Sequence, residues 1–204
     1  MIYYLSAFIF LCIGCTGYHS LNQPIIYKES PLSIAIPVIK GDVDGILRNA
    51  LVEEFSISGG YCYKPRDAKY DLIVKIVSNT KDRIGYKYDQ QPISGKRIQR
   101  LVPNEGRRSI DIDVTIVERL TKKKIKGPIR VSSFADYDYV NSNSFENMTV
   151  DPESGNFQSV LAYSLGQLGS EEEASNAALN PVFRSVAKKA ANYFRIALSL
   201  QKEL

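Results

Sequence analysis

The chain has 204 residues, a net charge of +4, three cysteines and a single histidine, His19. This length suits one domain, or one domain with extensions, rather than several. A triad or a histidine-containing metal site would have to be built on His19 alone. The sequence also has no CxxC pair, no P-loop and no glycine-rich nucleotide fingerprint. We therefore expect a protein that is not an enzyme and that holds no metal or cofactor.

An apolar run from Ile2 to Ile13 leads to Gly14 and Cys15. The run has the length of a signal-peptide core and is shorter than the roughly 20 residues that span a bilayer. The small residue before Cys15 resembles the lipobox of bacterial lipoproteins, whose cysteine is acylated with chains such as palmitate. We expect 1–14 to be a cleaved signal peptide and 15–31 a lipidated tether. A secreted protein cut elsewhere and a chance apolar terminus are alternatives, since residues 2–14 contain no Lys or Arg.

Positive charge is concentrated in the middle of the sequence. Residues 61–130 contain eighteen Lys and Arg against eight Asp and Glu, a net of +10, whereas residues 131–204 contain five against nine. Concentrated positive charge favours an anionic partner, such as lipid phosphates or an acidic protein surface. Export argues against nucleic acid as that partner. The alternative is that these charges are solvated residues of strand edges and turns.

The segment that follows the tether predicts a strand followed by a helix. Leu32–Val38 alternates with period two, as a strand does. Apolar residues at steps of three and four predict a helix over Val43–Ile57, with Asp42 as its N-cap. Ser58-Gly59-Gly60 should end it, because glycine adopts the left-handed conformation at helix ends.

Three more strands follow. They are predicted over Tyr70–Val77, which is open to extension as far as Tyr88, over Ile110–Val117, and over Ile129–Tyr137. Alternating apolar and polar residues in these segments indicate a sheet with one dry face. Thr121–Lys124 reads as a hairpin turn between the last two strands. Cys62 lacks a second free cysteine and is expected to be a buried or half-buried apolar side chain.

The last third predicts a loop and helices. Residues 138–156 are polar and read as a loop inserted into the domain, and Phe157–Leu168 carries a short helical stripe. Ser170 with Glu173 fits a capping box. Asn180-Pro181 fits the start of a final helix that runs to Leu200.

Together these elements predict one α+β domain over 32–204, with a mostly antiparallel (mixed) four-stranded sheet and two main helices on one face. The predicted core residues are Leu47, Leu51, Ile112, Val114, Val186 and Phe194.

The start Cys15-Thr16-Gly17-Tyr18-His19 resembles the mature start of the LptE-type lipoproteins of the outer-membrane lipopolysaccharide translocon. The segments Asn49–Gly60 and Ala68–Val74 are similar to the helix, glycine turn and strand entry of that family. The resemblance covers roughly 15–135, and more loosely the final helix. It implies a protein without catalysis on the periplasmic face of the outer membrane. Such a protein plugs or supports a β-barrel and contacts lipopolysaccharide.

The candidate glycolipid contacts lie in or beside a long connection predicted over 86–109, which also holds Tyr86 and Tyr88. They are Lys87, Lys96, Arg97, Arg100, Arg107 and Arg108. Arg matches phosphate geometry with a bidentate fork, and Lys acts as a point charge. Two alternatives are left open. One is a periplasmic scaffold or activator of a cell-wall synthase or secretion pore. The other is an anionic-lipid-binding lipoprotein with no barrel partner.

Overall fold

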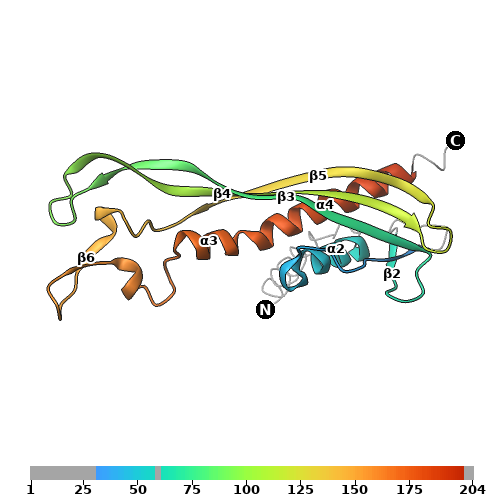
Figure 1. Cartoon of the computed structure of the whole chain (residues 1–204), viewed down its shortest axis with the longest axis horizontal. Coiled ribbons are helices and arrows are strands. Elements are labelled where there is room, and N and C mark those ends of the chain that lie inside the picture. Colours follow the sequence, from blue (N-terminus) through green and yellow to red (C-terminus); the bar gives the residue numbers. More distant parts are fainter. Residues whose placement is uncertain (1–30, 58–60, 200–204) are drawn as a thin grey trace, which may run out of the picture. The chain divides into compact units, whose positions relative to one another are not determined.

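The structure, a computed structural model, describes residues 31–57 and 61–199, with side chains placed as far as Phe194 (Figure 1). The predicted signal peptide, most of the tether, the Ser58-Gly59-Gly60 stop and Leu200 lie outside the described residues. The strands are β1 (Leu32–Ala35), β2 (Tyr61–Tyr63), β3 (Tyr70–Gln90), β4 (Arg97–Glu118), β5 (Lys124–Asp138), β6 (Met148–Val150) and β7 (Phe157–Ser159). The helices are η2 (Val43–Gly45), α2 (Ile46–Ile57), η3 (Phe145–Asn147), η4 (Val160–Tyr163), α3 (Glu171–Ala177) and α4 (Leu179–Ser199).

The main sheet has five strands in the order β2-β1-β3-β4-β5. Strands β3, β4 and β5 form an antiparallel meander, with Val74 opposite Val114 and Ile112 opposite Val131. Strand β1 is parallel to both of its neighbours, because α2 carries the chain back between β1 and β2. The α+β class with a mixed, mainly antiparallel sheet is therefore confirmed. The short strand β2 was not predicted.

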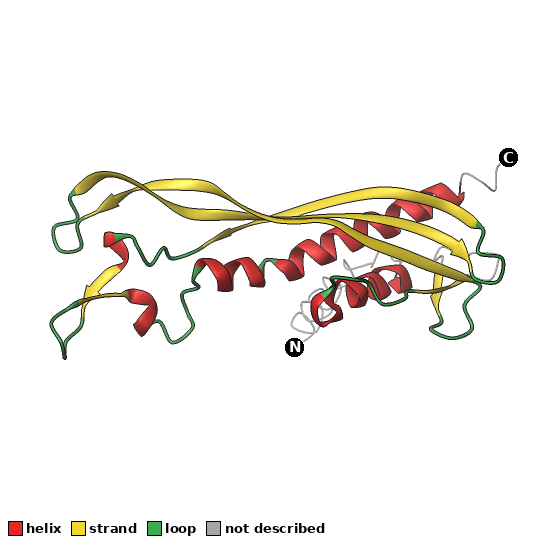
Figure 2. Ribbon diagram, viewed as in Figure 1, coloured by secondary structure: helices red, strands yellow, loops and turns green. Residues whose placement is uncertain are grey.

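The core lies between the sheet and the two main helices, which cover the same face (Figure 2). Helix α4 packs on β4 and β5, and α2 packs on α4. All six predicted core residues have no exposed surface. Large apolar side chains buried to this degree contribute about 1.5–3 kcal/mol each, so this layer dominates the stability of the domain.

Helix starts differ from the predictions. Helix α2 begins at Ile46 rather than Val43, because Asp44 and Gly45 adopt left-handed φ angles of 57° and 69°. Asp42 still caps it: the backbone N–H groups of Leu47 and Arg48 donate to its carboxylate at 3.0 and 2.8 Å. The predicted N-cap at Asn180 is wrong. Helix α4 begins at Leu179, directly after α3.

The capping box that begins α3 is confirmed, because the side chains of Ser170 and Glu173 each accept from the other's backbone N–H. The predicted helical stripe over Phe157–Leu168 is wrong. Its residues form β7 and the single 3-10 turn η4, and most of them are exposed. The predicted 138–156 loop contains η3 and β6, and β6 pairs with β7 in a small second sheet.

The predicted connection over 86–109 is also wrong. Strand β3 continues to Gln90 and β4 begins at Arg97, so only residues 91–96 turn the chain. Register shifts next to Ile76 and on both sides of Gly85 break the two-residue period of this hairpin. The apolar alternation that marks a half-buried strand is therefore absent there. We call the part of the hairpin from Lys81 to Arg108 the distal hairpin.

Candidate functional site

The six candidate residues lie in strands or at the turn, and on both faces of the distal hairpin. Lys87 belongs to β3, Lys96 to the turn, and the four arginines to β4. Lys87 forms an ion pair with Glu146 of η3 at 2.8 Å, and Arg108 reaches Ser175 of α3 at 3.5 Å. These two residues face the layer of helices, which we call the inner face.

Arg107 lies on the opposite, outer face, since neighbouring strand residues point in opposite directions. It pairs with Asp136 of β5 at 2.7 Å and stacks on the ring of Phe134 at 4.2 Å. The bidentate hydrogen bonds from Arg107 lower the pKa of Asp136 below its usual range. The structure therefore does not gather the six residues into one phosphate site.

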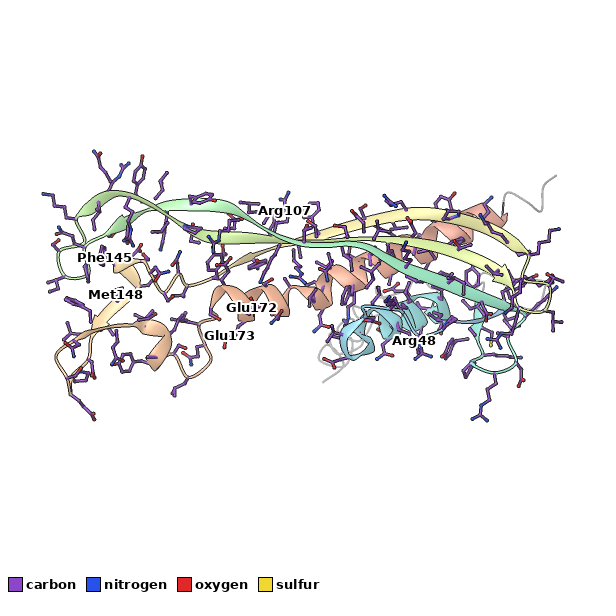
Figure 3. The ribbon with its side chains drawn as sticks, in the orientation of Figure 1. Arg48, Arg107, Phe145, Met148, Glu172 and Glu173 are labelled. Carbon is purple, nitrogen blue, oxygen red and sulfur yellow. The ribbon has the colours of Figure 1, made fainter. Side chains whose placement is uncertain are left out.

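Acidic residues from the last third of the chain neutralise much of the distal hairpin. Lys81 and Arg83 form ion pairs with Glu172 and Glu171 of α3 at 2.7 and 2.8 Å. Figure 3 labels Glu172 on α3 and Arg107 on the strands above that helix. The basic middle and the acidic end of the sequence therefore partly neutralise each other within one molecule. The sequence analysis did not predict these internal ion pairs.

Asp89, near the end of β3, is a fully buried carboxylate that sequence reasoning missed. Its oxygens accept from the Ser144 hydroxyl at 2.8 Å and from the backbone N–H groups of Phe145 and Glu146 at 3.1 Å. Burial alone would raise the pKa of Asp89. The hydrogen bonds, led by that from Ser144, outweigh burial and lower the pKa to about 2.

Arg100 completes this buried cluster. Its guanidinium lies 2.7 Å from the Asp89 carboxylate, stacks on the ring of Phe145 at 4.6 Å, and donates to the carbonyl of Asn143. The cluster fastens η3 to the inner face of the hairpin. Arg100 is therefore a structural residue here, rather than a free cation that awaits a phosphate.

An open cavity of about 650 Å³ lies beside this cluster. Its charged and aromatic lining residues are Lys81, Arg83, Arg100, Tyr139, Glu171 and Glu172. The Nε of Arg100 and the hydroxyl of Tyr139 are buried without a hydrogen-bond partner among the described residues. Burial, followed by the nearby Glu171, raises the pKa of Tyr139. The positive and negative charges of the ion pairs in its wall largely cancel. The cavity is therefore polar but carries little net charge.

The outer face of the distal hairpin carries exposed apolar side chains, which we call the outer stripe: Ile84, Tyr86, Tyr88 and Leu101. Tyr88 stands opposite Leu101 across the two strands. Their exposed fractions are 44% and 57%. The Arg97 guanidinium stacks on the Tyr88 ring at 3.5 Å. Arg97, one of the six candidate glycolipid contacts, is therefore part of this surface. The spacing of Tyr86 and Tyr88 was the only signal of this stripe in the sequence.

Other chemistry is sparse among the described residues. No group of three or more His, Cys, Asp or Glu side chains there is arranged to hold a metal ion. Cys62 is half-buried, as predicted, and forms no disulfide within the described residues. Within residues 31–57 and 61–199, no helix combines the length and the apolar character needed to cross a bilayer.

Comparisons with known proteins find a similar fold only at a distance. The chain matches no family model and no curated protein sequence. A protein described as a lipoprotein from Caulobacter crescentus is 11% identical, with a TM-score of 0.46 over 81% of this chain and 90% of that one. A minor lipoprotein from Acinetobacter baumannii is 12% identical, with a TM-score of 0.43 over 79% and 91%.

A Xanthomonas campestris protein of a domain family of unknown function is 10% identical, with a TM-score of 0.45 over 86% of this chain and 90% of that one. Similarities at this level do not assign a function to the chain.

Proposed function

We propose that this chain is a lipoprotein of a bacterial envelope, anchored through acyl chains at Cys15, that acts by binding a partner protein with its outer stripe and not by catalysis. The anchor is inferred from the apolar run and the small residue before Cys15. Two or three acyl chains hold a protein on a membrane stably, whereas one chain does so only marginally.

The outer stripe is the observation that carries the binding role. Aromatic side chains and Arg are enriched at protein interfaces, and they supply most of the energy at binding hot spots. Tyr86, Tyr88 and Leu101 are each at least 44% exposed, and Arg97 lies flat on one of the rings. The stripe is also braced from behind, because Asp89 fastens η3 to the inner face of the same strands. A rigid surface loses little conformational entropy on binding.

The narrower proposal concerns the partner. The resemblance to LptE-type lipoproteins favours a β-barrel of the lipopolysaccharide translocon in the outer membrane, with glycolipid contact at the distal hairpin. Among the six candidate residues, Lys96 and Arg97 are the ones we propose for that contact. They are exposed at the turn, whereas Lys87, Arg100 and Arg107 are engaged in ion pairs. A cell-wall synthase or a secretion pore is the alternative partner.

Co-purification from detergent-solubilised outer membranes tests this proposal. The parent protein should recover a β-barrel, identified by its change in gel migration on heating. The variant Tyr86→Ser/Tyr88→Ser/Leu101→Ser should recover at least about tenfold less, because truncated hot-spot residues cost at least ~1 kcal/mol each. These three side chains lie outside the core, so the thermal midpoint should stay close to that of the parent.

Ile73→Ser/Val77→Ser is the matched control, since these residues lie on β3 outside the distal hairpin and are 43% and 40% exposed. The control should recover the barrel as well as the parent does. Equal recovery of the barrel by the parent and the stripe variant would show that the outer stripe does not bind it. Recovery of a synthase or a pore in place of a barrel would select the alternative.

A further inference from the structure

One end of the main sheet is strongly basic, and the distal hairpin does not contribute to it. We call this end, formed by residues 64–71 and 118–126, the basic end. Its cations are Lys64, Arg66, Lys69, Arg119, Lys122, Lys123, Lys124 and Lys126. Its acids are Asp67, Asp71 and Glu118, so the eight cations exceed the three acids by five charges.

The sheet register brings these two segments together. Tyr70, at the start of β3, stands opposite Glu118, at the end of β4, and Val117 stands opposite Lys124, at the start of β5. The backbone N–H of Arg119 donates to the carbonyl of Lys69 at 2.9 Å, which fastens the two segments to each other. The basic end is thus one continuous surface.

Two of the three acids are already engaged. Asp71 lies 2.6 Å from the Arg119 guanidinium and 3.8 Å from the Lys122 ammonium, and Glu118 accepts from the Thr121 hydroxyl at 2.6 Å. The lysines of the β4–β5 turn remain open to solvent, and the side chain of Lys122 is 72% exposed. Leu120, in the same turn, is 93% exposed. The surface therefore combines excess positive charge with one protruding apolar side chain.

The chain also enters the described structure at this end. Strand β1 runs parallel to β3, with Ile34 opposite Tyr70, so Leu32 lies beyond the start of β3 and pairs with Tyr61. Residues 16–31 separate Leu32 from Cys15, and a chain of that length reaches at most about 60 Å. An anchor at Cys15 would keep the basic end within that distance of the membrane.

We propose that the basic end is a docking surface for the anionic lipid headgroups of the membrane that holds the protein. The inference rests on the proposed acyl anchor for its location, and it adds a second surface to the outer stripe. Lysines next to a bilayer are attracted by its negative surface potential, and Leu120 is placed to enter the headgroup region. Docking at this end directs the distal hairpin away from the bilayer. A barrel partner would then be met on its periplasmic side.

Vesicle binding by the full chain without acylation (Cys15→Ser) tests this surface separately from the anchor. Vesicles of phosphatidylcholine with 30% phosphatidylglycerol are compared with pure phosphatidylcholine vesicles, at low and high salt. Each lysine near an anionic surface strengthens binding about fivefold. The variant Lys122→Gln/Lys123→Gln/Lys124→Gln should therefore bind the anionic vesicles on the order of 100-fold less tightly, and the difference should shrink at high salt.

The matched control is Lys40→Gln/Lys75→Gln/Lys188→Gln, which removes the same charge from three exposed positions outside the basic end and the distal hairpin. The control should lose much less affinity than the turn variant. Equal binding of the parent and the turn variant to anionic vesicles would overturn the proposal, and so would equal binding of the parent to both kinds of vesicle. Failure of the anchor would show separately, as an unmodified Cys15 in the mass spectrum of the native protein.

Discussion

At the scale of single residues, Asp89 shows how one buried carboxylate connects distant parts of the chain. Its partners Ser144, Phe145 and Glu146 lie 55 to 57 residues further along the sequence. The residues around Asp89 in the sequence do not predict that contact. An aspartate between tyrosines and glutamines is typical of an exposed strand end as well as of a buried one. The carboxylate could be found only when the fold had brought the two segments together.

The pKa of Asp89 predicts a dependence of stability on pH. The folded pKa of about 2 lies below the ordinary value of 3.8, so the stabilisation is present above about pH 4 and is lost as the pH falls toward 2. At 1.36 kcal/mol per pKa unit, the contribution at neutral pH is about 2 kcal/mol. Asp89→Asn should lower the free energy of unfolding by about this amount at pH 7, as measured by urea denaturation.

The difference between the parent and Asp89→Asn should shrink when the same titration is done near pH 2.5. The control is Asp113→Asn, which alters a partly exposed carboxylate paired with the exposed Arg130 on the outer face and should have a much smaller effect at pH 7. Equal stability of Asp89→Asn and the parent at pH 7 would show that the buried carboxylate does not stabilise the contact between η3 and the hairpin.

At the scale of elements, the sequence predicted the strand segments that have one sheet face against the core. It did not predict the strand segments of the distal hairpin, where neither face packs on the core. Ile110, Ile112, Val114 and Ile116 alternate with polar residues because α4 packs against them, and that period is readable. Beyond Lys81 the inner face of β3 meets acidic side chains and a polar cavity instead. Its strand residues are therefore charged, and the register shifts interrupt the period that remains.

The helix layer allows a direct test of the predicted core. Leu51 of α2 has no exposed surface, and Val43, just before the helix, is 68% exposed. Leu51→Ala should lower the free energy of unfolding by ~2–5 kcal/mol, because the cavity is only partly refilled. Val43→Ala should change it by less than ~0.5 kcal/mol. A thermal midpoint unmoved by Leu51→Ala would contradict the packing of α2 on the core.

At the scale of the whole described chain, the distribution of charge has two separate consequences. The sequence showed an excess of +10 over residues 61–130, which we interpreted as a surface for an anionic partner. In the structure, Lys81, Arg83 and Lys87 of that region are paired with glutamates from the last third. Much of the remaining excess is at the basic end. Composition can report how much charge a segment carries, but only the sheet register reveals which cations are left free.

We propose that the two ends of the sheet meet different partners, a protein at the outer stripe and a lipid surface at the basic end. Photo-crosslinking from a reactive amino acid placed at Tyr88 or at Leu120 in the native, membrane-bound protein would identify the two partners. We expect the amino acid at Tyr88 to yield an adduct with a protein and the one at Leu120 to yield adducts with lipid. Lipid adducts from Tyr88, together with protein adducts alone from Leu120, would contradict the proposal.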